Sequence, residues 1–340
     1  MFASRVVAWQ ERHGRHDLPW QNTRDPYRVW LSEVMLQQTQ VATVKAYFGR
    51  FVLRFPDVHT LAAAQLDEVM ALWSGLGYYS RARNLHRCAC AIVEKWNGVF
   101  PERADELVTL PGIGRSTAAA IASLCFGERV AIMDANVRRV LARYLAFEGD
   151  LAQQASVKLL WEQACGLLPD AGLGHTMPAY TQGIMDLGAA VCLPRQPMCG
   201  SCPVREDCAA LQQGRPQDFP VRSRTLKRSA RSVWLLWARD CADAVWLQRR
   251  PVPGVWAGLY CLPWFDSREA LVAQVPAPYR PALLDAQAIK HVLTHMDLHL
   301  HPVRVDLPPD AAAGPEGQWY GVDQWPLLGL PAPVRVLLQA

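Results

Sequence analysis

The sequence predicts a mostly α-helical N-terminal region followed by an α+β C-terminal domain. Apolar residues recur at helical spacing as far as about Ala190, which is the pattern of amphipathic helices. After a basic stretch at residues 214–231, this pattern gives way to β-branched and aromatic runs separated by Pro and Gly, which is typical of strands. A chain of 340 residues is long enough for two domains. We therefore expect domains at residues 1–213 and 232–340, joined by a linker at residues 214–231.

Composition limits where the protein can work. No apolar run reaches the ~18 residues that a membrane helix needs, and no signal peptide follows Met1, so we expect a cytoplasmic protein without a membrane partner. Ten cysteines in such a chain favour a reducing compartment. The net charge of +4 is weak support for a polyanionic partner. Residues 214–231 carry six basic residues and one acidic residue, which suits a solvated linker and a contact to a phosphate backbone equally well.

The first candidate site residue lies on a helix predicted from Pro26 to about Thr39. Asp25 suits the N-cap and Pro26 the first helical position. Glu33 falls on a mostly apolar face, where burial would raise its pKa and keep it protonated near neutral pH. A half-exposed surface glutamate is the alternative. The neighbouring Gln38 and Thr39 carry uncharged donors and acceptors that suit base edges.

A glycine-spaced loop follows at residues 75–79. Its side chains Leu76, Tyr78 and Tyr79 suit a wedge that replaces lost stacking in an opened base stack. From sequence alone, an equally good interpretation is that Tyr78 and Tyr79 pack together in the core. The arginines Arg81 and Arg83 are candidates for phosphate contacts.

The centre of the chain contains a tight turn, Pro111 to Gly114, between two helical patterns. Gly112 and Gly114 are expected to take left-handed angles there and to let the backbone approach another molecule. Arg115 opens the next helix, whose free N–H groups and positive end suit a nucleic-acid phosphate. Asp134 follows beside several arginines, where we expect the chemistry. A plain helix–helix turn is the alternative for residues 111–114.

Four cysteines in the spacing C-x6-C-x2-C-x5-C indicate a metal site. They are Cys192, Cys199, Cys202 and Cys208. Thiols this close together in a reducing compartment favour metal over disulfides, and the ligand type alone allows either zinc or an iron–sulfur cluster. We expect the other six cysteines to be inert core residues.

The C-terminal domain is expected to contain five strands and one helix. The strands are predicted at Arg231–Trp237, Ala244–Gln248, Leu259–Leu262, Ala288–Leu293 and Leu298–Val305, and the helix at Ser267–Val275.

Several of these segments together resemble one family. The runs Trp30–Val41, Gly75–Tyr79, Leu110–Ser116 and Met133–Val137, with the cysteine spacing, closely resemble bacterial adenine DNA glycosylases of the MutY type, within the endonuclease III superfamily. The resemblance implies a helix-hairpin-helix glycosylase fold, a [4Fe–4S] cluster on the four cysteines and a Nudix-like C-terminal domain. It also implies a monomeric, nucleoid-associated enzyme of base excision repair.

The resemblance implies a reaction and its residues. The partner would be double-stranded DNA in which adenine is mispaired with 8-oxoguanine or guanine, and the adenine N-glycosidic bond would be hydrolysed after base flipping. Glu33 would protonate adenine, Asp134 would stabilise the oxocarbenium-like sugar, and Asn136 would support Asp134. Ser116 stands at the position of the Schiff-base lysine of lyase-competent relatives, which implies a glycosylase that leaves the abasic site uncut.

Further roles follow from the same matching. Trp20, Gln21 and Gln182 would line the adenine pocket. Gln38, Thr39, Leu76 and Tyr78 would lie on the lesion-strand side, and Gly112, Gly114 and Arg115 would hold a phosphate.

The C-terminal domain is expected to recognise the lesion. Its run Arg249–Tyr260 resembles a Nudix module, but the helix that follows has a single glutamate, Glu269, too few carboxylates for a divalent ion. We therefore expect a reader and not a hydrolase. The resemblance implies that it reads 8-oxoguanine with Thr294 and His295, with Leu293 where the family has phenylalanine. A structural histidine is the alternative for His295.

Two other functions fit parts of the sequence. An endonuclease-III-like glycosylase/lyase acting on oxidised pyrimidines would share the helical fold, but Ser116 and the C-terminal domain oppose it. A non-catalytic sensor of DNA damage would share the cluster, but the presence of both Glu33 and Asp134 opposes it.

Overall fold

The computed structural model describes residues 2–21, 23–170, 176–223, 228–311, 313–314 and 316–339. The chain forms two compact units, one made of Met1–Ala62 with Arg87–Thr225 and the other of Ala63–His86 with Leu226–Ala340. The boundaries fall within α4 (Val58–Ala63) and α6 (Ser80–Trp96) and between α12 (Ala209–Gln212) and β1 (Ser229–Arg239). No helix among the described residues is both long enough and apolar enough to cross a bilayer.

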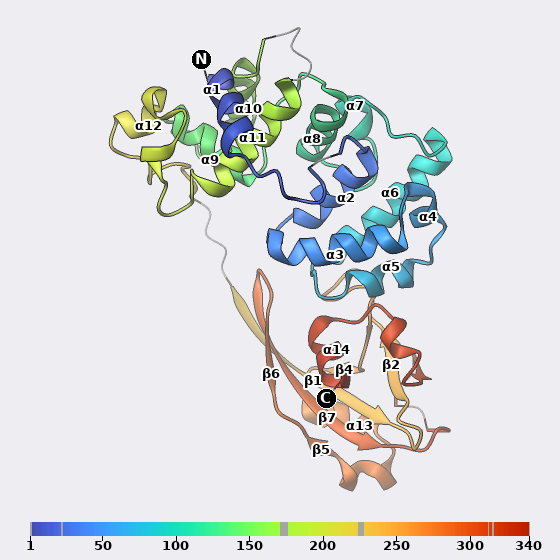
Figure 1. Ribbon diagram of the computed structural model, residues 1–340. Coiled ribbons are helices and arrows are strands. Elements are labelled where there is room, and N and C mark those ends of the chain that lie inside the picture. Colours follow the sequence, from blue (N-terminus) through green and yellow to red (C-terminus); the bar gives the residue numbers. More distant parts are fainter. Residues whose placement is uncertain are drawn as a thin grey trace. The chain divides into compact units, whose positions relative to one another are not determined.

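The first unit is helical (Figure 1). Besides parts of α4 and α6 it contains α1 (Phe2–His13), α2 (Pro26–Leu36), α3 (Val41–Arg54), α7 (Ala104–Leu107), α8 (Arg115–Phe126), α9 (Ala135–Tyr144), α10 (Gln154–Gly166), α11 (Thr176–Ala190) and α12 (Ala209–Gln212), with short 3-10 turns η1 (Cys199–Ser201) and η2 (Arg205–Asp207).

Helix α11 is central to this unit because two glycines let its neighbours approach closely. A Cβ added at Gly183 would lie 2.9 Å from the Val6 side chain of α1, and one at Gly188 would lie 2.7 Å from the Asn136 Cβ of α9. Such contacts are closer than ordinary packing allows, so α1 and α9 can lie against α11 only where it lacks side chains. Apolar residues of the three helices, among them Val140 and Leu187, form one buried core.

The second unit contains a mixed sheet in the order β3-β2-β1-β7-β5, with β4, β6 and β8 paired to β1, β7 and β2 respectively. Its strands are β1 (Ser229–Arg239), β2 (Val245–Arg249), β3 (Tyr260–Cys261), β4 (Trp264–Phe265), β5 (Leu284–Asp285), β6 (Ile289–Val292), β7 (Met296–Asp306) and β8 (Gly317–Tyr320). Its helices are α5 (Leu66–Trp73), α13 (Arg268–Gln274) and α14 (Ala332–Gln339), with 3-10 turns η3 (Ala277–Ala282) and η4 (Trp325–Leu327).

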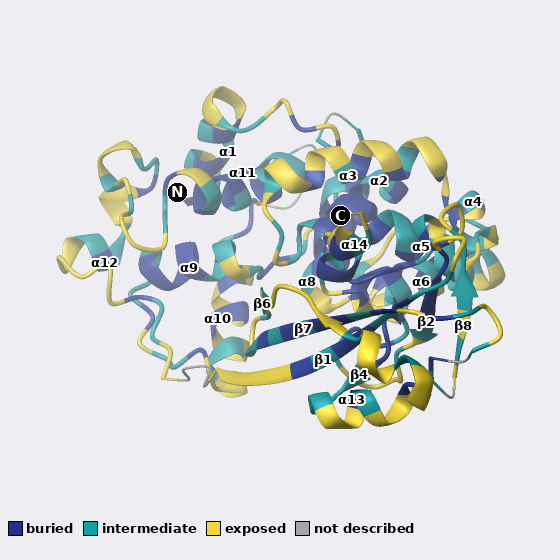
Figure 2. Cartoon of the chain, turned by 90° about the horizontal axis from the view of Figure 1, so that it is seen from below, coloured by how far each residue is buried: buried dark blue, intermediate teal, exposed yellow. Residues whose placement is uncertain are grey.

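The two longest strands, β1 and β7, form the middle of this sheet. They pair in parallel from Ser229 opposite Met296 to Arg239 opposite Asp306, whereas the other strand pairs are antiparallel. Figure 2 shows that β1 starts exposed and becomes buried along its length. One face of the pair contributes Leu236 and Val303 to a core that Leu271 of α13 also joins.

The mostly α and α+β architecture is confirmed, and the differences in detail are local. All five expected strands and the helix at residues 267–275 are present within two residues of their predicted ends. The predicted helix to Thr39 was too long, because α2 ends at Leu36 and Gln38 takes a left-handed φ of 58°. Strands β4, β5 and β8 and helix α14 were not predicted. Residues 63–86 belong to the second unit, a grouping that no local pattern indicates.

Candidate active site

Glu33 lies on α2, which starts where the sequence predicts. The Asp25 side chain accepts a hydrogen bond from the Tyr27 N–H at 3.0 Å, and Pro26 occupies the first turn. The neighbours Ser32 and Val34 are buried, whereas Glu33 itself keeps a small exposed fraction. Burial, reinforced by the negative charge of Asp134, raises the pKa of Glu33 to about 7. The structure thus favours a protonated carboxyl near neutral pH over an ordinary surface glutamate.

Asp134 forms the N-cap of α9 on a different part of the chain. Its Oδ1 accepts a hydrogen bond from the Val137 N–H at 2.6 Å. Burial raises the pKa of Asp134 above its usual value, while hydrogen bonds from the backbone of Val137 and Asn136 and the charges of Arg139 and Arg138 oppose that rise. These donors and positive charges stabilise the ionised form of Asp134.

The two carboxyl groups therefore have different environments and interact with each other. The charge of Asp134 is one cause of the raised pKa of Glu33, which requires that the two lie close enough to sense each other. Burial acts on both groups, but hydrogen-bond donors and arginine charges oppose its effect at Asp134, whereas a neighbouring negative charge adds to its effect at Glu33. Such a pair can provide one proton donor and one fixed negative charge.

Ser116 and Asn136 hold the segment that carries Asp134. The Ser116 Oγ accepts a hydrogen bond from the Met133 N–H at 3.1 Å, next to Asp134. The Asn136 side chain accepts from Arg139 Nη2 at 2.9 Å, and Arg139 also donates to the Cys192 carbonyl at 2.7 Å. Asn136 reaches Asp134 through its backbone, while its side chain is engaged by Arg139.

The turn before α8 presents the predicted backbone to solvent, with one correction. Gly112 has the expected left-handed φ of 77°, but Gly114 has φ −84° and ψ 166° and is the N-cap of α8. The prediction for Gly114 was wrong because a helix N-cap takes extended angles. A Cβ added at Gly114 would meet nothing within 4 Å, so its face is open. Arg115 is exposed and its guanidinium lies 4.0 Å from the centre of the Trp161 ring.

The three residues expected to line an adenine pocket share one cavity of about 390 Å³. Trp20, Gln21 and Gln182 all contribute to its wall, and the buried Trp20 ring packs edge-on against Phe48 at 5.2 Å. Val29 also lines this cavity and lies one helical turn before Glu33 on α2. Residues four apart share a helix face, so the cavity and Glu33 lie on the same side of α2.

Sequence reasoning missed two residues of this site, Arg15 and Asp186. Asp186 of α11 is fully buried and pairs with Arg15, whose Nη2 lies 2.6 Å from the Asp186 Oδ1. A single acid among apolar residues of a helix is a signal for a buried partner, but the partner is far away in the sequence.

The residues expected on the lesion side divide between the two units. Gln38 and Thr39 follow α2 in the first unit, with Gln38 exposed. Tyr78 belongs to the second unit, where it is 41% exposed, whereas Leu76 is only 5% exposed. The wedge interpretation therefore suits Tyr78 better than Leu76, whose side chain lies in the interior.

In the second unit, Tyr78, Thr294 and His295 line one cavity of about 450 Å³. The hydroxyl groups of Tyr78 and Thr294 are hydrogen-bonded to each other. The loop at residues 75–79 and the loop between β6 and β7 are thus brought together within the unit. Leu293 and Trp256 add apolar and aromatic surface to the same cavity. Glu269 is exposed on α13.

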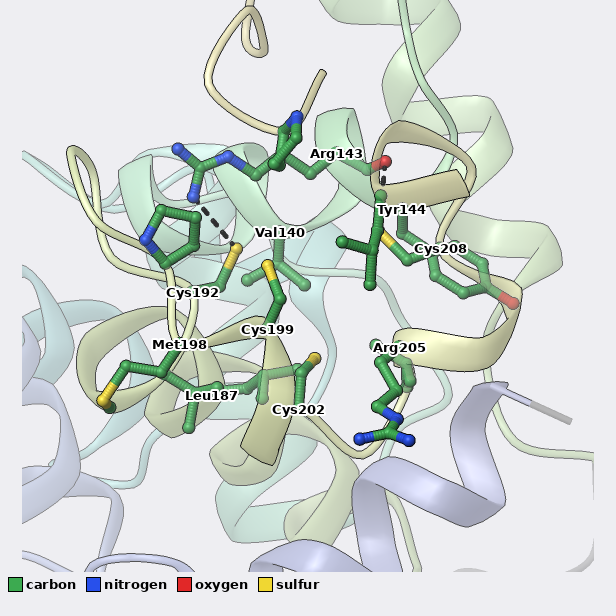
Figure 3. Close-up of a pocket in the computed structure, with 15 residues that line it drawn as sticks. Val140, Arg143, Tyr144, Leu187, Cys192, Met198, Cys199, Cys202, Arg205 and Cys208 are labelled. Atoms are coloured by element: carbon green, nitrogen blue, oxygen red, sulfur yellow. Dashed lines mark hydrogen bonds between the residues drawn. The ribbon is translucent and has the colours of Figure 1, made fainter. Parts of the chain in front are cut away.

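The four spaced cysteines line one cavity, which Figure 3 shows. Cys192 follows α11, Cys199 begins η1, Cys202 directly follows η1, and Cys208 caps α12. Arg143, which is buried, donates to the Cys192 sulfur at 3.3 Å and to the Leu193 carbonyl at 2.6 Å.

The four thiols fit an iron–sulfur cluster in number and type, because such a cluster is held by four cysteine thiolates. The same donor set also suits zinc. Of the six other cysteines, Cys88, Cys125 and Cys261 are buried as expected, but Cys165 and Cys241 are exposed, so the core prediction was wrong for those two.

Comparison with known proteins gives the family. Residues 31–164 match the HhH-GPD superfamily of base excision DNA repair proteins, and residues 233–340 match the NUDIX domain. An adenine DNA glycosylase of Buchnera aphidicola subsp. Acyrthosiphon pisum is 34% identical over 344 residues, covering 100% of this chain and 97% of that protein. The adenine DNA glycosylase of Mus musculus is 44% identical over 221 residues, covering 62% of this chain and 42% of that protein.

A solved thermostable thymine-DNA glycosylase has a similar fold, with a TM-score of 0.55 and 28% identity over 62% of this chain and 95% of that one. That similarity and the HhH-GPD match agree with the helical fold described above. The Buchnera relative covers both the helical part and the NUDIX part. The chain therefore belongs to the adenine DNA glycosylases, base excision repair enzymes of the HhH-GPD superfamily.

Proposed function

We propose that this enzyme removes adenine mispaired with 8-oxoguanine, and more weakly with guanine, from double-stranded DNA. The observation that carries the proposal is the pair of carboxyl groups, in which burial and the charge of Asp134 raise the pKa of Glu33 to about 7. Adenine leaves poorly as an anion and well when protonated, so a neutral acid beside the base provides what the reaction needs. Because a paired adenine is inaccessible, the base is first flipped out of the stack.

The two carboxyl groups divide the work of cleavage. Glu33 donates its proton to N7 of adenine, the atom that the family resemblance implies. As the N-glycosidic bond breaks, positive charge develops on the sugar and Asp134 stabilises it as a fixed anion. The Asp134 carboxylate is held by the Val137 N–H, and the preceding segment is held by Ser116. Water then adds to the sugar and gives up a proton, which restores the Glu33 acid and leaves an abasic site.

Ser116 supports a reaction without strand cleavage. A hydroxyl group cannot form an imine with the sugar, and this hydroxyl already accepts a hydrogen bond from Met133. We therefore propose that the enzyme leaves the abasic site uncut. An endonuclease-III-like lyase would require an amine at this position.

We further propose that the cavity of Tyr78, Thr294 and His295 recognises 8-oxoguanine. Its hydroxyl and imidazole groups can donate and accept hydrogen bonds, as lesion recognition requires. Leu293 lacks the aromatic face of the phenylalanine found in the family, so stacking on the lesion should be weaker. The exposed Glu269 offers too few carboxylates for a Nudix hydrolase site.

The cysteine cavity would hold a [4Fe–4S] cluster through Cys192, Cys199, Cys202 and Cys208. When bound, the cluster would join the loop after α11 to α12. Iron and acid-labile sulfide measured on the purified chain should be about four per chain in the wild type. Cys202→Ser should lower both, and Cys165→Ser, at an exposed cysteine, is the matched control. Zinc in place of iron would contradict this part of the proposal.

We propose a monomer that works on DNA in the bacterial cytoplasm, associated with the nucleoid. The exposed Gly112, Gly114 and Arg115 would hold a backbone phosphate at the start of α8.

The decisive experiment is a glycosylase assay on duplexes with adenine opposite 8-oxoguanine, guanine, cytosine and thymine. Adenine should be released opposite 8-oxoguanine and guanine, and the strand should break only after alkali. Glu33→Gln and Asp134→Asn should lose release yet retain mismatch binding. Full activity in either variant would contradict the assigned roles, and a borohydride-trapped covalent complex would favour a lyase. Binding without base release by the wild type would favour a sensor.

A further inference from the structure

One side chain in the adenine cavity has its amide held in a single orientation. The Nε2 of Gln182 donates to the Oδ1 of Asp186 at 3.0 Å, one turn further along α11. Asp186 is fully buried and accepts two further hydrogen bonds from Arg15, from its backbone N–H to Oδ2 at 3.0 Å and from its Nε to Oδ1 at 2.7 Å. The Arg15 Nη2 also lies 2.6 Å from Oδ1, so the oxygen that accepts from Gln182 is held by the Arg15 guanidinium as well.

This arrangement determines which atom Gln182 can offer to a ligand. An ionised carboxylate only accepts hydrogen bonds, so the nitrogen of the Gln182 amide must face Asp186 and its oxygen must face away. Rotating the amide would place two acceptors against each other. In contrast, both polar atoms of the Gln21 side chain are buried without a hydrogen-bond partner, so Gln21 can donate or accept.

The fixed orientation of the Gln182 amide matters because purines differ in the group that they carry at position 6. Adenine carries an amino donor there, whereas guanine and hypoxanthine carry a carbonyl acceptor. An oxygen held in the cavity can accept from the amino group and repels the carbonyl, while the Gln21 amide can adapt to either. Discrimination between adenine and a 6-oxopurine therefore depends on Gln182, whose amide cannot rotate.

We propose that Arg15 and Asp186 are positioning residues that fix the Gln182 oxygen toward the flipped base, so that the cavity selects a 6-aminopurine over a 6-oxopurine. This inference rests on the proposed function, because it assumes that the cavity receives the flipped base.

The test compares release of adenine and of hypoxanthine, each opposite 8-oxoguanine, under single-turnover conditions. For each variant the adenine-to-hypoxanthine rate ratio is divided by that of the wild type, which cancels the different reactivity of the two bases. Asp186→Asn allows the Gln182 amide to rotate, and Gln182→Met removes it. Both should lower the ratio about tenfold, the size expected when one hydrogen bond becomes unselective. Asp17→Asn is the matched control, because it breaks an exposed ion pair to Lys45 and should leave the ratio unchanged.

Each other outcome has a definite meaning. A ratio that stays at the wild-type value in both variants overturns the inference while the proposed function stands. Equal losses of both rates together with a lower melting temperature also overturn it, because they indicate a purely structural ion pair. A wild-type chain that releases no adenine overturns the proposed function, and the inference with it.

Discussion

Replacing Glu33 by glutamine should stabilise the protein at alkaline pH while abolishing base release. The pKa of Glu33 rises from 4.5 to about 7 on folding, because burial and Asp134 disfavour its charged form. The folded state therefore holds this proton more tightly than the unfolded state. The resulting loss of stability is absent below pH 4.5, accumulates as the pH rises to about 7, and is complete above pH 7.

The size of the effect follows from the same pKa. A fully buried group with this pKa would lose about 3 kcal/mol above pH 7, and the partial exposure of Glu33 reduces this to about 2 kcal/mol. A neutral glutamine of the same shape avoids the loss. Relative to the wild type, Glu33→Gln should therefore gain about 2 kcal/mol in free energy of unfolding between pH 5 and pH 8.

Urea unfolding followed by tryptophan fluorescence at several pH values provides the assay. Glu162→Gln is the matched control, because it makes the same chemical change at an exposed position of α10, with 61% of the side chain accessible. Its stability should stay close to that of the wild type, because an exposed ion pair contributes little. Glu33 would not be a buried acid with a raised pKa if Glu33→Gln were no more stable than the wild type at pH 8. The same would follow if its gain in free energy of unfolding did not grow with pH.

Three further predictions concern activity. Single-turnover adenine release should fall about tenfold between pH 6 and pH 8, because the protonated form of Glu33 is required and its pKa is about 7; a rate that rises over this range would exclude Glu33 as the acid. Ser116→Ala should slow adenine release about fivefold without producing strand breaks, because the Met133 N–H loses its hydrogen-bond acceptor. An unchanged rate would show that Ser116 does not position the segment that carries Asp134. Thr294→Val removes the hydrogen-bond partner of Tyr78 and should reduce the preference for 8-oxoguanine over guanine severalfold. The measurement is the ratio of adenine release rates opposite the two bases. An unchanged ratio would exclude the cavity of Tyr78, Thr294 and His295 from recognition of the lesion.

The parts of the fold that sequence predicts well are those with a long periodic pattern. Strands β1 and β7 have eleven residues each, and the N-terminal end of α2 has a capping aspartate followed by proline. Strands β4 and β5 have two residues each, too few to show any alternation. The short β8 begins with Gly317 and is defined by its pairing with β2 rather than by its own composition.

Motifs in the sequence indicate Glu33 and Asp134 as candidate site residues, and the structure adds that their charges interact. The contact between Arg15 and Asp186 joins residues that are 171 apart in the chain, and no local sequence pattern predicts such a pair. The extended backbone of Gly114 was missed because a glycine in a tight turn also suits an N-cap.

The parallel pairing of β1 with β7 affects how the chain can fold as it is synthesised. Helix α8 follows its partner α7 directly in the chain, and α10 follows its partner α9, whereas β1 gains its longest partner only after the ribosome has delivered Asp306. Until then the apolar side chain of Leu236 lacks Val303 of β7, with which it shares a buried core. A nascent chain that stops before β7 therefore exposes an aggregation-prone strand, which makes this interval the one in which a chaperone has most to protect.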